Sequence, residues 1–172
     1  ARTGIGNSDD IDTTVTTLSA TNTTSGNIDI HETDGLIIAG SGVLTQGGNG
    51  NINVDVDAGD LAVNSVVSAN GSGTVTLNAD AGTVTTGAVV SSTSGSIDIN
   101  GTAVVQNADI STSGTVTVDA SSGSIDMADG TTTTGSSIGY TAATDVALST
   151  LSSTGTVAVT ASGGAISDEL SG

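Results

Sequence analysis

The chain has 172 residues and a formal net charge of −17, because 18 acidic residues outnumber a single basic one, Arg2. Nucleic acid and anionic membrane surfaces are therefore excluded as partners, since binding to either requires clustered Lys and Arg. No apolar run is long enough to span a bilayer, so membrane insertion is not expected. The absence of cysteine is compatible with secretion and gives no disulfide framework.

The first 25 residues predict an irregular first coil. Ile5, Ile11, Val15 and the segment 18–20 supply apolar positions, with glycine and asparagine turn residues near the start. From residue 26 onward the chain is regular, and no linker divides it. We therefore expect one domain over residues 1–172, with regular coils over 26–172.

A short phrase, Gly-x-[Ile/Val]-x-[Ile/Leu/Val], recurs along the rest of the chain. It occupies residues 26–30, 50–54, 73–77, 95–99, 114–118 and 155–159. A weaker copy keeps the apolar pair Ile138 and Tyr140 but has Ser136 in place of glycine. The first apolar residues of successive copies are 24, 23, 22, 19, 22 and 19 residues apart. A period near twenty with internal alternation is typical of stacked β-coils.

Each period divides into three short apolar segments separated by Gly, Asn, Asp and Ser. In the third copy these segments are 75–79, 84–86 and 89–90. Alternate residues of a strand point inward, and β-branched side chains suit a narrow interior. No stretch shows the periodicity of a helix. The sequence therefore predicts an all-β fold, a parallel β-helix (β-solenoid) of about seven to eight coils with three short strands per coil, about 35–40 Å long.

Stacking aligns equivalent residues of successive coils into columns. The residue before the first apolar position of the phrase is always small and polar. This column consists of Asn27, Asn51, Thr74, Ser96, Thr115, Ser137 and Thr156. Such side chains can hydrogen-bond along the rod, as in the ladders of stacked β-structure. The next two outward columns never place two Asp residues in adjacent coils, which limits repulsion between like charges.

Four oxygen-bearing side chains, Asn53, Asp55, Asp57 and Asp60, lie within eight residues. Calcium prefers such hard oxygen ligands, so this cluster is the candidate metal site of the sequence. Its spacing lacks the sixth-position glycine and the closing Glu of an EF-hand loop. The competing and favoured interpretation is a solvated acidic face, and no other cofactor is expected.

Catalytic chemistry is hard to build from these residues. Solenoid polysaccharide lyases need a basic side chain as proton acceptor, and Arg2 lies outside the repeats. Glycosidases need two carboxylates about 5–9.5 Å apart and usually aromatic rings for the sugar, yet Tyr140 is the only aromatic residue. His31 and Glu32 are neighbours in the sequence, but there is no second His with which to form a relay or a metal site. We therefore expect no enzymatic activity.

Two surface-binding functions are the alternatives to a structural role. Thr-x-Thr triplets at 74–76, 83–85 and 115–117 are similar to the flat Thr arrays of ice-binding solenoids. In other coils the same columns carry Asp, Asn, Gly or Ala, so the face lacks the regularity that matching to ice requires. The other alternative is a carbohydrate-binding surface, with a host or cell-surface glycan as the partner.

Three segments, together with the repeat phrase, resemble the repeats of filamentous-haemagglutinin-type giant surface adhesins. The segments are Gly-Gly-Ala-Ile-Ser-Asp at 163–168, Thr-Gly-Ile-Gly at 3–6 and Ile-Asp-Thr-Thr-Val at 11–15. The resemblance implies a right-handed parallel β-helix that is secreted to the cell surface and has a structural or adhesive role. It supplies no catalytic motif.

Neither end of the predicted solenoid shows a cap, although an open coil leaves backbone N–H and C=O groups unpaired. Leu18 and Ala20 begin the repeat early, and Val157, Val159 and Ile166 continue it toward the other end. An uncapped end can pair with the opposite end of a second copy, and this heterologous contact propagates into a filament. The sequence therefore predicts a non-catalytic structural subunit of an extracellular filament or adhesin stalk, whose partners are copies of itself.

Overall fold

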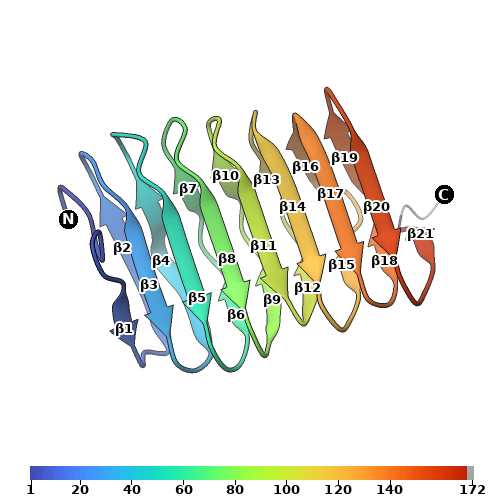
Figure 1. Cartoon of the computed structure of the whole chain (residues 1–172), viewed down its shortest axis with the longest axis horizontal. Helices are drawn as coiled ribbons and strands as arrows, with labels where there is room; N and C mark the ends of the chain where they lie inside the picture. Colours follow the sequence, from blue (N-terminus) through green and yellow to red (C-terminus); the bar gives the residue numbers. More distant parts are fainter. Residues whose placement is uncertain (170–172) are drawn as a thin grey trace.

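The computed structural model describes residues 1–169 and shows a parallel β-solenoid of about 7 turns (Figure 1). Successive turns lie side by side along one axis, and the N-terminus lies at one end of the row. The strand pairings among the described residues are parallel. The predicted all-β parallel solenoid is confirmed, while its right-handed winding stays a prediction.

The first sheet contains one strand from each turn, in the order β1-β3-β5-β8-β11-β14-β17-β20. Its strands are β1 (Ile11–Thr13), β3 (Ile28–Glu32), β5 (Ile52–Val56), β8 (Val75–Ala79), β11 (Ile97–Gly101), β14 (Thr115–Ala120), β17 (Ser137–Ala142) and β20 (Val157–Ala161). The apolar pair of every repeat phrase falls in these strands, and the phrases pair in register from turn to turn. The repeat phrase therefore marks one face of the solenoid.

The second sheet has 13 strands and forms the other two faces. The long strand β4 (Leu36–Thr45) crosses the corner between those faces, because its first part pairs with β6 and its last part with β7. One face continues through β6 (Leu61–Val63), β9 (Thr83–Thr86), β12 (Ala103–Gln106), β15 (Ile125–Met127), β18 (Val146–Leu148) and β21 (Ile166–Asp168). The other continues through β7 (Val67–Ala69), β10 (Val90–Ser92), β13 (Ile110–Ser111), β16 (Thr132–Gly135) and β19 (Thr150–Ser153). β2 (Thr17–Asn22) pairs with β4 from the N-terminal side, with a register shift between Leu18 and Ala20.

Alternation along each strand separates an apolar interior from a polar surface. In β5, for example, Ile52, Val54 and Val56 are fully buried, and the polar residues between them are half-buried on the outer face. The buried residues form one continuous cluster along the solenoid. Most of them are Val, Ile and Leu, which pack closely in a narrow interior.

One polar cluster lies inside this apolar interior. The Tyr140 hydroxyl donates to Gln106 Oε1 at 2.6 Å, and Thr133 Oγ1 lies 2.6 Å from the same hydroxyl. Gln106 Nε2 donates in turn to Thr133 Oγ1 at 2.9 Å. All three side chains are buried, and burial raises the pKa of Tyr140 above its usual range. Because each polar group has partners, the cluster links strands of three successive turns without leaving these groups unsatisfied.

The glycine of the repeat phrase lies where successive turns approach most closely. A Cβ on Gly50, Gly73 or Gly95 would overlap the carbonyl oxygen of the corresponding glycine in the preceding turn. The constraint is therefore close backbone approach, which requires a residue without a side chain. This contact explains why the phrase begins with glycine in turn after turn.

A column of small polar side chains, not recognised from the sequence, forms hydrogen bonds with the backbone on the inner side of the same corner. Thr45, Ser92, Thr112 and Ser153 donate their hydroxyls to corner carbonyl oxygens at 2.6–3.0 Å. Three of these hydroxyls also accept a hydrogen bond from the N–H of a repeat glycine two or three residues later. At the corner the backbone leaves the sheets, and these hydrogen bonds satisfy N–H and C=O groups there. In the sequence, the signal for this column is a Ser or Thr shortly before the glycine of the repeat phrase.

We expect Gly73→Ala to lower the free energy of unfolding by about 1–3 kcal/mol, because the added methyl group must displace the backbone of the preceding turn. Gly139→Ala is the matched control: it lies on β17, where a Cβ would be 3.9 Å from Thr117 Cγ2. The control should change the free energy by no more than about 0.5 kcal/mol. Urea unfolding followed by circular dichroism measures both, and equal stabilities would contradict the close-approach explanation.

Tyr140→Phe should lower the free energy of unfolding by about 1–3 kcal/mol, because Gln106 and Thr133 stay buried and lose a partner. The double variant with Gln106→Leu should lose less than the sum of the two single variants, since it removes the stranded amide as well. Thermal unfolding of the three variants measures this coupling. Strictly additive losses would show that the three side chains do not act as one cluster.

Candidate functional site

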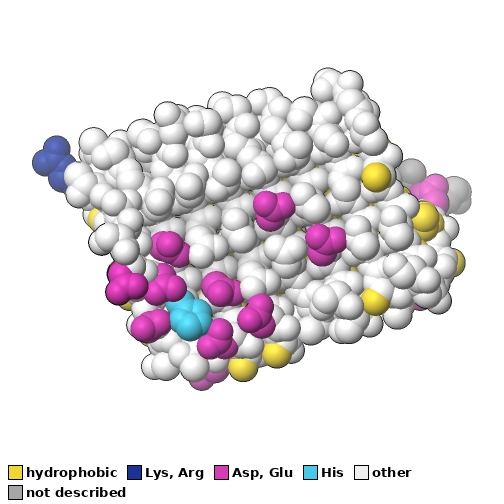
Figure 2. Space-filling view, viewed as in Figure 1, with side chains coloured by type: hydrophobic (Ala, Val, Ile, Leu, Met, Phe, Trp, Pro, Cys, Tyr) yellow, Lys and Arg dark blue, Asp and Glu magenta, His cyan; other side chains and the backbone are white. Residues whose placement is uncertain are grey.

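Acidic side chains gather around the single histidine over the first turns of the repeat-phrase face (Figure 2). His31 lies on β3, with its Nδ1 2.9 Å from Asp12 Oδ1 on β1 and its Nε2 2.8 Å from Asp57 Oδ1 just after β5. The hydrogen bonds to Asp57 and Asp12 raise the pKa of His31 to about 9. The ring is therefore protonated at neutral pH and donates to both carboxylates, which joins three consecutive turns.

Glu32, the next residue, points the other way and is completely buried. Its carboxylate accepts hydrogen bonds from Thr13 Oγ1 at 2.5 Å and from Val15 N at 3.0 Å. Desolvation raises the pKa of Glu32, but the hydrogen bonds from Thr13, Val15 and Asp34 together lower it below its ordinary value. Glu32 thus fastens residues 13–15 to the second turn. The sequence carried a signal for this role, because an acid stands at an inward position of the repeat.

The four predicted calcium ligands are engaged with different neighbours. Asn53 Nδ2 donates to Asp29 Oδ1 at 2.8 Å, and Asp55 Oδ1 accepts from Asn78 Nδ2 at 2.7 Å. Both contacts join residues of adjacent turns in the first sheet. Because these columns never place two Asp residues in adjacent coils, a donor can stand beside each of the Asp29 and Asp55 carboxylates.

The other two predicted ligands lie beyond the end of β5. Asp57 is bound to His31, and Asp60 Oδ1 accepts a hydrogen bond from Thr83 N at 2.8 Å. Asp109 and Asp145 receive backbone N–H groups of the following turn in the same way. Within residues 1–169, no three His, Asp or Glu side chains are arranged to hold a metal ion. These acids act in the structure as links between turns.

The predicted polar ladder follows the edge of the repeat-phrase face. Asn27 Oδ1 accepts a hydrogen bond from Asn51 N at 3.0 Å, and Asn51 Oδ1 accepts one from Thr74 N at 2.9 Å. Asn7, outside the predicted set, begins the series by accepting from Asn27 N at 3.0 Å. At the other end, Ser137 Oγ donates to Thr156 O at 3.2 Å. Ser96 and Thr115 lie in the column between these two parts.

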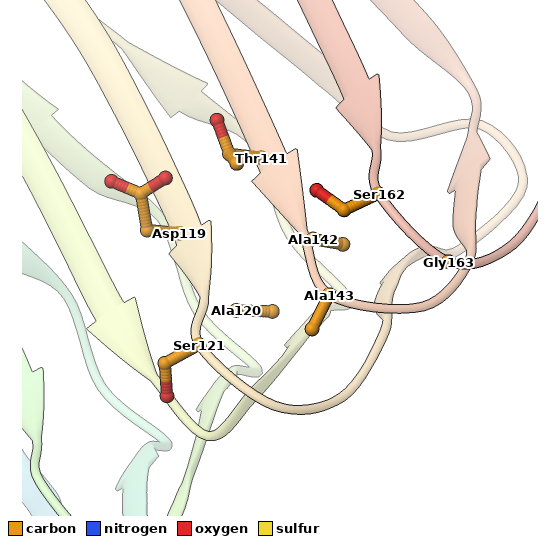
Figure 3. A pocket seen from close by; sticks show the side chains of 8 residues that line it. All are labelled: Asp119, Ala120, Ser121, Thr141, Ala142, Ala143, Ser162 and Gly163. Carbon is orange, nitrogen blue, oxygen red and sulfur yellow. The ribbon is translucent and has the colours of Figure 1, made fainter.

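A shallow groove of about 440 Å³ runs over the corner that follows β14, β17 and β20 (Figure 3). Asp119, Thr141 and Ser162 present oxygen atoms to it, and alanines form its floor. A smaller groove of about 200 Å³ shares Asp119 and Ser121 and extends toward the earlier turns. The lining residues offer hydrogen-bonding groups for hydroxyl-rich ligands but include no aromatic ring.

The two ends of the solenoid differ in how well the predicted assembly residues are covered. At the N-terminal end Leu18 is half-buried and Ala20 is buried, because both lie on β2 beside β4. At the C-terminal end Val157 and Ile166 are exposed and Val159 is partly buried. Strands β19, β20 and β21 are the outermost strands there among the described residues.

No protein-family model, curated protein or solved structure matches the chain. Among residues 1–169 the structure contains no helix with the length and apolar character needed to cross a membrane. The fold and the contacts described above are therefore the basis for assigning a function.

At pH values below about 6.5, we expect His31→Gln to lower the midpoint temperature of unfolding. The difference from the unchanged protein should shrink as the pH rises. The folded-state pKa of about 9 lies above the ordinary 6.5, so the stabilisation is complete below 6.5 and is lost as the pH rises through 9. Thermal unfolding of both proteins across this range measures the difference. Asn100→Gln, in the same outward column, should show no such pH dependence. A pH-independent difference for His31→Gln would contradict the three-turn contact.

Proposed function

We propose that the protein is a non-catalytic structural element of an extracellular filament or adhesin stalk, in which copies join head-to-tail through the solenoid ends. The observation that carries this proposal is the exposure of core columns at the C-terminal turn. Val157 is 43% exposed and Ile166 is 53% exposed. The preceding members of the same columns, Ile138 and Val146, are buried. A further turn would bury both side chains.

A second copy of the chain is the occupant that fits this end, because both ends carry the same columns. Continuing the observed registers by one turn pairs β20 with β1 of the next copy and sets Val159 against Ile11. It likewise pairs β19 with β2 and sets Leu151 against Ala20. Ile11 is itself 41% exposed at the N-terminal end. The joint therefore buries apolar side chains from both copies.

The charge distribution supports axial rather than lateral association. The formal charge of −17 makes copies repel one another when they lie side by side. In the axial joint, parallel strand pairing and apolar contact act against this repulsion, and added salt screens it. The expected product is a thin, unbranched fibre. The resemblance to surface adhesins supports an extracellular location.

At high protein concentration and moderate salt, the chain should form unbranched fibres with an axial repeat of about 35–40 Å. Negative-stain electron microscopy and sedimentation velocity measure the product. Ile166→Lys should abolish the fibres, because a charged side chain then occupies the joint. It cannot act by adding repulsion, since a lysine lowers the net negative charge.

Val89→Lys is the matched control, because Val89 is 43% exposed on the side of the solenoid and outside the joint. This variant should assemble as the unchanged protein does. Strictly monomeric behaviour of the unchanged protein at every concentration and salt would refute head-to-tail assembly.

Carbohydrate binding is the second candidate, and the groove beside Asp119 is the observation that favours it. The Asp119 carboxylate and the hydroxyls of Thr141 and Ser162 on the next two turns can hydrogen-bond to the hydroxyl groups of an extended sugar chain. A glycan bound in this groove, and lost in Asp119→Ala without any change in assembly, would favour this function. Fibres formed without any ligand favour the structural one.

A further inference from the structure

Three segments of the chain carry the tripeptide Asn-x-Ser/Thr, the acceptor signal for N-linked glycosylation. They are residues 22–24, 70–72 and 100–102. The sequence is rich in Asn, Ser and Thr, so the tripeptide by itself selects no site. A folded protein can receive a sugar only where the asparagine amide and the hydroxyl two residues later are both accessible to a transferase. The three segments differ in this respect.

The first tripeptide is inaccessible because its asparagine is buried. Asn22 lies on β2 and is 0% exposed. Its Nδ2 donates to Ser25 O at 2.7 Å and to Gly26 O at 2.6 Å. Glycosylation would need this nitrogen, whose two hydrogens already bind the backbone of the corner. A sugar at Asn22 would therefore require the first coil to unfold.

The third tripeptide is held within the first sheet. Asn100 lies on β11, where its backbone pairs with Asn78 of β8 on one side and Asp119 of β14 on the other. Thr102 follows the strand, and its N–H and Oγ1 both donate to Gly82 O, at 2.8 and 2.9 Å. The threonine hydroxyl is thus bound to the preceding turn. A transferase could use this segment only if the sheet opened.

The second tripeptide lies in the exposed turn between β7 and β8 (Figure 1). Asn70 and Ser72 are both exposed, and within residues 1–169 neither side chain forms a hydrogen bond. Gly73 N donates to Asn70 O at 3.1 Å, which closes a β-turn over residues 70–73. The N–H groups of Asn70 and Ser72 each bind the preceding turn at 3.1 Å. The backbone of this segment is therefore fixed while both side chains are free.

We propose that Asn70 is an N-glycosylation site of the folded protein, and that its substrate is a sugar activated as a diphosphate ester. The Asn70 amide nitrogen attacks the anomeric carbon of the sugar and forms the new C–N bond. The bond between that carbon and the diphosphate oxygen breaks, and the diphosphate leaves with the electron pair. The amide loses one proton to a base of the transferase. The Ser72 hydroxyl is the group by which the transferase recognises the acceptor.

The position of Asn70 keeps the sugar away from both ends of the solenoid. In the second sheet β7 is separated from the outermost strand β19 by β10, β13 and β16, and from β2 by β4. A glycan is bulky and well hydrated, so at this position it would hinder side-by-side contacts between copies and leave the end-to-end joint open. The site itself does not depend on head-to-tail assembly.

The test incubates the folded chain with UDP-glucose and a soluble N-glycosyltransferase that recognises Asn-x-Ser/Thr. A parallel reaction with a lipid-linked oligosaccharide and a membrane oligosaccharyltransferase shows which kind of diphosphate donor the site uses. Mass spectrometry of the intact chain and of its peptides measures the product. The chain should gain one sugar unit, attached to Asn70, from at least one donor.

Three variants locate the reaction, and circular dichroism checks that each is folded. Asn70→Gln should lose the mass shift because the acceptor is removed. Ser72→Ala should lose it too, although it keeps Asn70, because the recognised hydroxyl is absent. Asn100→Gln is the matched control and should gain the sugar as the unchanged protein does. Unstructured synthetic peptides containing each tripeptide should all be modified, since neither burial nor the sheet protects them.

Each other outcome overturns the proposal. If the peptide containing Asn70 is modified but the folded chain is not, the folded turn does not fit a transferase. If the folded chain takes the sugar at Asn22 or Asn100 as readily as at Asn70, accessibility does not select the site. If Ser72→Ala is modified as fully as the unchanged protein, the tripeptide is not the signal. Fibre formation by the unmodified chain is measured separately, so head-to-tail assembly can stand or fail independently.

Discussion

The structure depends on one constraint: at the glycine corner, the backbone of each turn rests on a carbonyl oxygen of the turn before. Gly50, Gly73 and Gly95 have no room for a side chain there. In the turns that carry this glycine, the contact fixes their spacing and register, so that apolar positions fall into continuous inward columns. Differences in turn length must then be absorbed elsewhere. The first full turn spans 24 residues between phrases and uses the long β4, where Gly40 and Gly42 adopt positive φ.

The acidic surface follows from the same stacking. Side chains in equivalent positions of adjacent turns lie about 4.8 Å apart, so two carboxylates in sequence along a column would repel each other. The solenoid places donors between them: Asn78 beside Asp55, His31 beside Asp12, and backbone N–H groups beside Asp60. Composition alone suggests that the negative charge serves only to keep the protein soluble. In the structure the same carboxylates also hold neighbouring turns together. Glu32 extends this principle to the interior, where desolvation makes the donors indispensable.

Much of the fold could be predicted because one residue pattern repeats. The predicted segments 75–79, 84–86 and 89–90 correspond to Val75–Ala79, Thr83–Thr86 and Val90–Ser92. What could not be predicted depends on contacts between turns. From the sequence, the cluster Asn53, Asp55, Asp57 and Asp60 is interpreted as a solvated acidic face in preference to a calcium site, and neither interpretation identifies the residues of other turns that these side chains contact.

The interior polar groups escaped prediction for a related reason. The hydroxyl of Ser92, for example, accepts from the nearby Gly95 N–H but donates to a carbonyl oxygen 19 residues away in the preceding turn. The burial of Ala20 likewise depends on the way β2 lies against β4, across a register shift that no local pattern announces. Spacing predicts which residues share a column, whereas the partners within a corner depend on the geometry of the chain.

The hydrogen bonds between turns also determine how the protein responds to force. Because strands pair from turn to turn, these hydrogen bonds lie along the axis of the rod, and an axial load stretches them directly. The outermost C-terminal turn, whose side chains are the most exposed, would peel first. At the N-terminal end, the contacts of His31 and Glu32 fasten the first coil. Each released turn of about twenty residues adds up to about 65–70 Å of extended chain, so the rod lengthens in steps under tension.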